Sequence, residues 1–149
     1  MFMNSKSLVQ TAALPFIRAG RGIEVALITS RERRRWIVPK GWPVDGLSLS
    51  AAAAREAEEE AGLVGHVSET SIGAFDYVKQ TAAGYGVPCR VMVYPMETTM
   101  QLLDWPERGE RKLRWRKIAA AAEIVSDKSL GRLLSDLARR PHLLEHAQE

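Results

Sequence analysis

The sequence predicts one α+β domain of the α/β/α sandwich type, with a mixed β-sheet flanked by helices. Two features favour this class: strand-like segments lie on both sides of one helix rich in alanine and glutamate, and further helices follow near the end of the chain. The 149 residues are 46% hydrophobic, which supplies a core and argues against disorder. Since no internal repeat, low-complexity tract or linker interrupts the pattern, residues 1–149 are expected to form a single domain.

The N-terminal part is expected to form a β-hairpin followed by a short strand. Residues 8–18 are apolar and predict a strand, with an edge position or a bulge near Pro15, because proline has no amide to donate. A turn at residues 19–22 leads into residues 24–30, which alternate and are β-branched, as in the second strand of a hairpin. Residues 36–38 predict a short apolar strand that ends at a proline.

The central helix is expected to cover residues 51–61, since alanine and glutamate favour helices. A loop rich in glycine and proline precedes it at residues 40–46, and Ser48 or Ser50 is the expected N-cap. Gly62 suits the left-handed position that follows a helix. One side of the helix carries small residues that predict close packing on a sheet, and the acidic side then faces a cleft or solvent. These small residues are Ala53, Ala54, Ala57 and Ala61.

The second half of the chain is expected to add four strands and two helices. Apolar and alternating segments predict strands at residues 66–71, 72–79, 87–97 and 110–115. Helical patterns follow at residues 116–124 and 129–139, and Ser126 or Asp127 is expected to start the second of these helices.

The charge balance favours an anionic partner. The net charge is +3 and the sequence pI is about 9.2, and the basic residues occur in clusters that attract polyanions. Solvated surface is the alternative interpretation of each cluster. The clusters are Arg31, Arg33, Arg34 and Arg35, and then Arg108, Arg111, Lys112, Arg114, Arg116 and Lys117.

Three further observations bear on where the protein works. No apolar run approaches the roughly 18 residues of a membrane span, so no membrane contact is expected. The first residues lack the pattern of a secretory signal. Cys89 is the single cysteine, which excludes an intramolecular disulfide and fits a reducing compartment. A cytoplasmic location is therefore expected.

Three glutamates of the central helix give the first indication of chemistry. Glu56, Glu59 and Glu60 are spaced i, i+3 and i+4, so a helix places them on one face, where like charges repel. A hard divalent cation offsets such repulsion, and Mg²⁺ is often shared between carboxylates and substrate phosphates. The pattern therefore indicates a metal-dependent enzyme that acts on a phosphate-containing substrate.

The segment from Gly41 to Leu63 resembles the signature of the Nudix hydrolase family. That signature reads Gly, five residues, Glu, seven residues, and then Arg-Glu-aliphatic-any-Glu-Glu-any-Gly-aliphatic. The one clear departure is Leu47, where the family usually has glutamate. The flanking segments Trp-Ile-Val-Pro-Lys-Gly and Asp-Trp-Pro-Glu resemble the branch that acts on diphosphoinositol polyphosphates and dinucleoside polyphosphates. The matching residues are Gly41, Arg55, Glu56, Glu59, Glu60, Gly62 and Leu63, with Ala57 at an aliphatic position.

This resemblance implies that water cleaves a pyrophosphate linkage, with Mg²⁺ or Mn²⁺ as the cofactor. It implies Glu56, Glu59 and Glu60 as metal ligands or water-orienting groups, and the backbone carbonyl of Gly41 as a further ligand. The general base stays open between Glu59 and Glu97, which lies at the end of a predicted strand.

The resemblance also gives Arg55 a role, which is to orient a catalytic glutamate through an ion pair. Its usual second partner is the glutamate that Leu47 replaces, and a leucine side chain accepts no hydrogen bond. Asp45 is close in sequence and is a candidate replacement. Without a replacement, Arg55 is held less firmly and a lower activity is expected.

Six residues are candidate substrate contacts. Lys40 adjoins the motif and is suited to stabilise developing phosphate charge, and Trp42 is a candidate for stacking on a base. Arg90 lies in an otherwise apolar strand and is expected to face either the cleft or a carboxylate. Four of the candidates lie near strand ends that help to hold a polyphosphate in the resembling branch, and these are Arg18, Ser30, Arg31 and Arg90.

Three functions are compatible with the sequence, in this order. The first is a Mg²⁺- or Mn²⁺-dependent pyrophosphohydrolase for a small-molecule polyphosphate, with dinucleoside or diphosphoinositol polyphosphates ahead of other nucleoside diphosphate derivatives and capped RNA ends. The second, motivated by Leu47, is a Nudix-fold module that binds a phosphorylated ligand without hydrolysis. The third is a basic RNA-binding protein. DNA is not an expected partner, and the oligomeric state stays open between monomer and homodimer.

Overall fold

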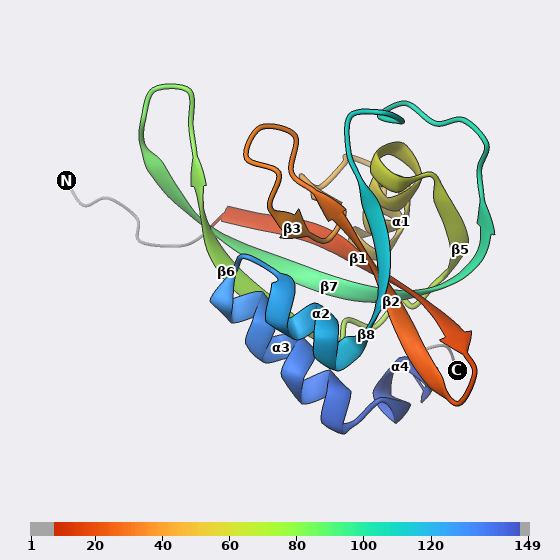
Figure 1. The fold of residues 1–149 in the computed structure, drawn as a ribbon. Helices are drawn as coiled ribbons and strands as arrows, with labels where there is room; N and C mark the ends of the chain where they lie inside the picture. The colour runs from red at the N-terminus through yellow and green to blue at the C-terminus, as the bar shows by residue number, and fades with distance from the viewer. Residues whose placement is uncertain (1–7, 147–149) are drawn as a thin grey trace.

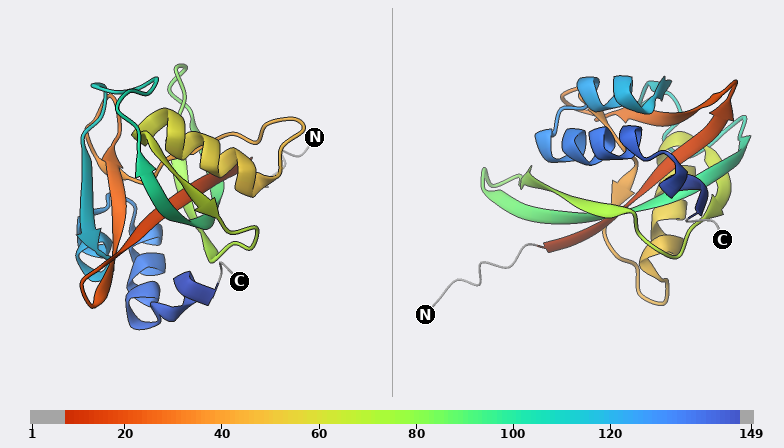
Figure 2. Two further views of the ribbon diagram at one scale, coloured as in Figure 1. Left: turned by 90° about the vertical axis from the view of Figure 1, so that its right-hand side faces the viewer. Right: turned by 90° about the horizontal axis from the view of Figure 1, so that it is seen from below.

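The computed structural model describes residues 8–146 and has three layers, which confirms the predicted sandwich. A mixed β-sheet forms the middle layer, α1 covers one face, and the other helices cover the opposite face (Figures 1 and 2). No helix of the described residues is long and apolar enough to cross a membrane. The helices are α1 Leu49–Ala61, α2 Ile118–Ile124, α3 Lys128–Arg139 and α4 His142–His146.

Within the described residues the sheet has eight strands, and β1 lies near its centre (Figure 1). The hydrogen-bonded order is β3-β2-β1-β7-β5, with β4 also paired to β1, β6 to β7 and β8 to β2. β1 and β7 run parallel, and the other pairs are antiparallel. The strands are β1 Leu8–Ala19, β2 Gly22–Thr29, β3 Trp36–Ile37, β4 Lys40–Gly41, β5 Leu63–Val67, β6 Gly73–Gln80, β7 Gly86–Gln101 and β8 Leu113–Lys117.

The edge position expected near Pro15 is wrong, because β1 lies between β2 and β7. Pro15 is in register with Met96 of the parallel neighbour β7. On the other side of β1, β4 pairs with Thr11 and Ala12, and β2 pairs from Phe16 onward. Pro15 therefore lies in the gap between these two short ladders, where a missing amide interrupts no pairing.

Several element boundaries are set by pairing with distant strands and differ from those expected. β5 begins directly after α1 at Leu63 and ends at Val67, so it starts and ends earlier than the strand expected at residues 66–71. β8 pairs with β2 as far as Lys117, so α2 begins at Ile118 rather than at residue 116. The short helix α4 adds to the expected elements.

The pleat of β1 divides its side chains between two cores. Ala12, Leu14 and Phe16 are fully buried on the side of α2 and α3, whereas Ala13 is fully buried on the side of α1. Small side chains on α1 let this helix approach the sheet closely, which brings its acidic residues beside the strand ends. These small residues are Ala53, Ala57 and Ala61, with Ala54 partly buried next to them, as the sequence predicts.

Both ends of α1 are fixed by residues that the sequence predicts. The Ser48 hydroxyl accepts a hydrogen bond from the Ala51 amide at 3.1 Å, so Ser48 is the N-cap. Gly62 follows the helix in the left-handed region, at φ 67°, and its amide donates to carbonyls of the last turn. A Cβ atom at Gly62 would lie 2.4 Å from the Trp105 ring. The helix end and the segment before β8 therefore both require glycine here.

We expect Gly62→Ala to destabilise the protein more than Gly20→Ala does. Both glycines have left-handed backbones, at φ 67° and 61°, so each substitution costs about 1 kcal/mol of conformational strain. Gly62 also faces the Trp105 ring, whose displacement adds about 1–3 kcal/mol. A Cβ atom at Gly20 meets nothing within 4 Å. Urea unfolding of the two variants measures the difference, and equal losses would contradict the role of Trp105.

Candidate functional site

Glu56 of α1 lies against the backbone of β4. A Cβ atom added to Gly41 would lie 2.5 Å from the Glu56 carboxyl carbon and from its Oε2. The Glu56 carboxyl group therefore fills the space that any side chain at position 41 would need. The two residues meet because β4 pairs with β1 beside the helix, and α1 packs on both strands. Glycine at the start of the motif thus lets the Glu56 carboxyl group occupy this position, and a side chain at position 41 would displace it.

Glu60 lies one turn further along α1 and is bound at both carboxyl oxygens. Its Oε1 accepts a hydrogen bond from the Lys40 amide at 3.1 Å, and its Oε2 accepts from the Arg111 guanidinium at 3.4 Å. The Glu60 side chain is 10% exposed and that of Arg111 is 8% exposed. This carboxyl group therefore has a fixed orientation in a setting that excludes most water.

Burial raises the pKa of both carboxyl groups. It raises the pKa of Glu60 to about 8, an effect that the Arg111 guanidinium opposes and the Glu56 charge strengthens. Burial likewise raises the pKa of Glu56, and the neighbouring Glu59 charge adds to that shift. The charged forms are disfavoured chiefly because burial removes them from water, and the neighbouring carboxylates add to this effect.

Closely spaced carboxyl groups with little access to water fit a hard divalent cation. Glu56 and Glu60 supply carboxylate oxygens, and the Gly41 backbone lies beside them, which is the kind of donor set that Mg²⁺ and Mn²⁺ take. Across residues 8–146, no three histidine, cysteine or acidic side chains are already gathered as a metal cluster. The arrangement is therefore a buried carboxylate, Glu60, beside a half-buried one, Glu56, with the third acidic residue of the motif turned aside.

That third residue, Glu59, is turned toward Arg55. The Arg55 Nε donates to Glu59 Oε1 at 3.1 Å, and both side chains are partly exposed. Leu47 is 40% exposed on the loop before α1. In the part of the chain that the structure describes, Asp45 makes no ion pair or hydrogen bond with Arg55. The structure thus gives Arg55 a glutamate partner on its own helix and places no second brace at positions 45 or 47.

Lys40 connects the acidic site with the opposite face of the sheet. It is in register with Ala12, which faces α2 and α3, and its ammonium group lies 4.5 Å from the centre of the Tyr77 ring. The Tyr77 hydroxyl donates to Gln10 Oε1 at 2.6 Å, which holds the ring. Burial lowers the pKa of Lys40, and the Glu60 carboxylate opposes that shift. Lys40 therefore binds Glu60 through its backbone amide, whereas its ammonium group lies on the opposite face of the sheet against Tyr77.

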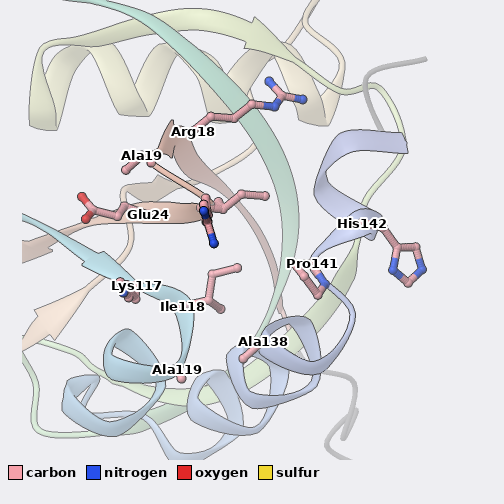
Figure 3. A pocket seen from close by; sticks show the side chains of 13 residues that line it. Arg18, Ala19, Glu24, Lys117, Ile118, Ala119, Ala138, Pro141 and His142 are labelled. Atoms are coloured by element: carbon pink, nitrogen blue, oxygen red, sulfur yellow. The ribbon is translucent and has the colours of Figure 1, made fainter.

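Arg18 and Glu97 lie away from the buried carboxylates. They form an ion pair with each other, and Glu97 is in register with Phe16, which faces α2 and α3. Arg18 also lines a pocket of about 660 Å³ between the β1–β2 turn, the start of α2 and the α3–α4 junction (Figure 3). The lining residues come from these segments and not from α1. The fold thus separates this pair from Glu56 and Glu60.

Two other arginines expected at the substrate are engaged on the surface. Arg90 lies opposite Asp76 on the paired strands β6 and β7 and contacts its carboxylate at 3.0 Å. Of the two surroundings expected for Arg90, the structure therefore has the carboxylate. Arg31 contacts Glu110 at 3.5 Å, and both side chains are exposed.

Ser30 and Trp42 lie in the loops that flank the short strands. The Ser30 hydroxyl accepts a hydrogen bond from the Arg35 amide at 3.0 Å, within the turn that follows β2. Trp42 is 43% exposed and follows Gly41 directly, so it is next in sequence to the backbone that contacts Glu56. Among the candidate substrate contacts, Lys40 and Trp42 are thus the two that adjoin the buried carboxylates in the chain.

Sequence reasoning missed two residues of the site, Arg111 and Glu107. Arg111 belongs to a cluster that was expected to attract polyanions or to be solvated, but its side chain is 8% exposed and contacts Glu60. It also contacts Glu107 at 2.8 Å. The two are four residues apart, a spacing that signals an ion pair on a helix, whereas this segment is a loop between β7 and β8. Glu107 ends the Asp-Trp-Pro-Glu segment noted in the sequence, but no local pattern places either residue beside Glu60.

A mixed sheet with an acidic helix held against a strand and loop defines the Nudix class of fold. The family model described as NUDIX domain matches residues 8–136. The chain belongs to the Nudix family, which confirms the resemblance that the motif predicts.

Curated relatives carry the names of Nudix enzymes. Nudix hydrolase 12, mitochondrial, of Arabidopsis thaliana is 31% identical over 123 residues, which cover 78% of this chain and 59% of that protein. Nudix hydrolase 17, mitochondrial, of the same plant is 34% identical, with 79% and 63% covered. Diphosphoinositol polyphosphate phosphohydrolase 3-alpha of Homo sapiens is 32% identical, with 76% and 67% covered. The chain spans about three fifths of the length of the two plant relatives.

Solved structures share this fold. The binary complex of a C. elegans Ap4A hydrolase has a TM-score of 0.66 at 18% identity, and the match covers 90% of this chain and 97% of that chain. The NUDIX domain of Shewanella oneidensis NrtR, complexed with ADP ribose, has a TM-score of 0.62 at 15% identity, with 91% and 89% covered. At these identities the likeness establishes the arrangement of the elements and nothing beyond it.

We expect the metal-free protein to lose stability as the pH rises from about 4.5 to about 8. The pKa of Glu60 is raised from its usual value of 4.5 to about 8, so the folded state holds this proton more tightly than the unfolded state. The stability from this group is complete below the lower value and is lost as the pH passes the higher one. Glu60→Gln removes this dependence.

Glu58→Gln is the matched control, because Glu58 is exposed on the same helix. Thermal unfolding in the presence of a chelator, between about pH 5 and about pH 8, measures the effect. The Tm of Glu60→Gln should rise relative to that of Glu58→Gln as the pH increases. A difference that stays constant over this range would contradict the raised pKa.

Proposed function

We propose that the chain catalyses the divalent-metal-dependent hydrolysis of a pyrophosphate linkage in a phosphate-rich substrate. The adjacent carboxyl groups of the buried Glu60 and the half-buried Glu56, with the pKa of both groups raised, are the observation that carries this proposal. A pair whose charge is not balanced by the protein suits a reaction in which cations and phosphates meet. The names of the relatives, which are hydrolases, support the same reaction class.

Glu56 and Glu60 would hold Mg²⁺ or Mn²⁺, with the carbonyl of Gly41 beside them. Such a cation polarises phosphoryl oxygens and lowers the pKa of bound water. The Lys40 amide and Arg111 keep the Glu60 carboxylate in one orientation, so its oxygens need no rearrangement during the reaction. Burial of these groups also lowers the local dielectric, which strengthens each charge interaction at the site.

Glu59 is better placed than Glu97 to act as the general base. Glu59 lies on the acidic side of α1, and Arg55 binds its Oε1, which leaves Oε2 to accept a proton from the attacking water. Glu97 instead pairs with Arg18 on the opposite face of the sheet. We therefore assign Glu59 as the base and Arg55 as the residue that orients it.

The substrate that fits best is a dinucleoside polyphosphate or a diphosphoinositol polyphosphate. Lys40 carries a partly buried cation that interacts electrostatically with Glu60 from the opposite face of the sheet. Trp42 offers an exposed ring next to Gly41, which suits stacking on a base. The human relative and the C. elegans structure are named for a diphosphoinositol polyphosphate and for Ap4A, one from each of these two substrate classes.

A second candidate function is the binding of a phosphorylated ligand without hydrolysis. Leu47 favours it, because Arg55 then has Glu59 as its partner in an exposed ion pair and lacks the brace usual in the family. Exposed ion pairs hold their partners weakly, at about 0–1 kcal/mol. An enzyme whose general base is held this weakly would turn over its substrate slowly.

We expect Glu56→Gln and Glu60→Gln each to lower turnover by at least about 100-fold. Each change removes a negative charge from the set that holds the metal. The measurement is product release at saturating Mg²⁺ or Mn²⁺ from a panel of dinucleoside polyphosphates, diphosphoinositol polyphosphates, nucleoside diphosphate sugars and capped RNA.

Glu58→Gln again serves as the control and should retain the wild-type rate, because Glu58 is exposed on the same helix. Wild-type turnover in both Glu56→Gln and Glu60→Gln would refute the site assignment. Calorimetric binding of a panel member with no product over hours would instead identify the binding module. RNA binding that weakens steeply with salt and ignores both substitutions would identify the third function considered from the sequence.

A further inference from the structure

The segment that joins β7 to β8, residues 102–112, closes over the C-terminal end of α1. The Leu102 amide donates to the Gly62 carbonyl at 2.8 Å, and the Glu107 amide donates to the Glu59 carbonyl at 3.1 Å. These bonds satisfy carbonyl groups that the end of a helix leaves without partners. The segment is therefore fixed on the helix turn that carries Glu59 and Glu60.

Arg111 joins this segment to both α1 and β2. Its Nε donates to Glu107 Oε1 at 2.8 Å, one terminal nitrogen donates to the Thr29 carbonyl at 3.1 Å, and the other donates to Glu60 Oε2 at 3.4 Å. Thr29 is tied to the same segment, because its hydroxyl accepts from the Lys112 amide at 2.9 Å. With 8% of its side chain exposed, Arg111 is a buried connector and not a solvated surface arginine.

We propose that the Arg111–Glu107 pair is the positioning element of the site, which holds the Glu60 carboxylate in the orientation that a metal ligand needs. The proposal rests on the proposed function of Glu60. Arg55 does not perform this task for Glu60, because it is exposed and bound to Glu59.

The geometry at Glu60 explains why two donors are needed. The Lys40 amide binds Oε1 and Arg111 binds Oε2, so the plane of the carboxyl group is fixed, whereas a single donor would leave it free to rotate. Arg111 has three acceptors in different directions, which match the planar fork of a guanidinium. A lysine ammonium is a compact point charge and does not span the same three acceptors.

Glu107 offsets the positive charge of Arg111, so that Arg111 orients Glu60 with little effect on the net charge of the site. A lone guanidinium beside Glu60 would repel a metal cation, but the Glu107 carboxylate 2.8 Å from Arg111 offsets that charge. The pair therefore orients a ligand while adding little net charge to the site. Replacing both residues by neutral amides leaves the net charge unchanged and removes the orientation, which makes the proposal testable.

The decisive variant is Arg111→Gln with Glu107→Gln in the full chain. Residues that orient metal ligands typically account for about 10- to 100-fold in metal affinity, so we expect the Kd for Mn²⁺ to rise by at least about 10-fold. Titration of the substrate-free protein with Mn²⁺, followed by calorimetry or electron paramagnetic resonance, measures this directly. With substrate present, kcat should fall while KM changes by less than about threefold, because the pair touches no substrate.

The matched control is Asp104→Asn with Arg108→Gln. These residues form another ion pair in the same segment, also four residues apart, but it is exposed and does not reach Glu60. The control should keep the wild-type Kd for Mn²⁺ within about twofold. A folded Arg111→Gln, Glu107→Gln variant that binds Mn²⁺ as tightly as the wild type overturns the proposal.

Arg111→Lys covers the case in which the double variant does not fold, because it retains the buried charge. We expect it to weaken Mn²⁺ binding in the same direction at a nearly unchanged Tm, and an unchanged Kd would overturn the proposal. If the wild-type protein itself shows no saturable Mn²⁺ binding, the proposed function fails. If the wild type binds Mn²⁺ and the Arg111 variants bind equally well, the positioning role alone fails.

Discussion

The structure around the site depends on the fixed orientation of one buried carboxylate, that of Glu60. A carboxylate removed from water needs hydrogen-bond donors, and here they arrive from two distant parts of the chain, the Lys40 amide on β4 and Arg111 before β8. Both can reach it only because α1 packs closely on the sheet through alanines and ends at Gly62, where the returning segment crosses the helix. The same close packing of α1 on the sheet accounts for glycine at position 41, because the Glu56 carboxylate occupies the space that a side chain there would need.

The negative charge of the carboxylates at this site indicates a function, because the cationic side chains of the protein do not balance it. Glu56, Glu60 and Glu107 lie around Arg111, which is the cation that contacts two of them. The Lys40 ammonium is turned to the Tyr77 ring rather than to a carboxylate. A purely structural ion-pair network would be closed, with each buried charge matched by a partner. Burial and the neighbouring carboxylates together raise the pKa of Glu56 and Glu60, and a divalent cation is the simplest partner that would favour their charged forms.

The sequence predicts α1 because its features depend on neighbouring residues. The rest of the site is hard to predict because it depends on contacts between residues far apart in the chain. Ser48, Gly62 and the spacing of the glutamates obey rules that operate within one or two helical turns, so the helix and its acidic side follow from the sequence. The position of Pro15 depends on which strands flank β1, and that pairing joins residues about 80 positions apart. Arg111 and Glu107 lie in a loop whose path is set by contacts with α1 and β2, so their burial has no local signature.

The two arginines beside the acidic residues restrain their glutamate partners to different degrees, because Arg55 is exposed and Arg111 is buried. An exposed ion pair such as Arg55–Glu59 competes with water and restrains its partners weakly, whereas a buried guanidinium with three acceptors has little competition. The rigid restraint therefore acts on Glu60, which we propose as a metal ligand that keeps one place. The weaker restraint acts on Glu59, which we propose as the general base, a group that accepts and releases a proton in each cycle. On this proposal, the acidic side divides into a rigid ligand and a looser base according to which arginine is buried, and the segment of residues 102–112 belongs to the site as much as the helix does.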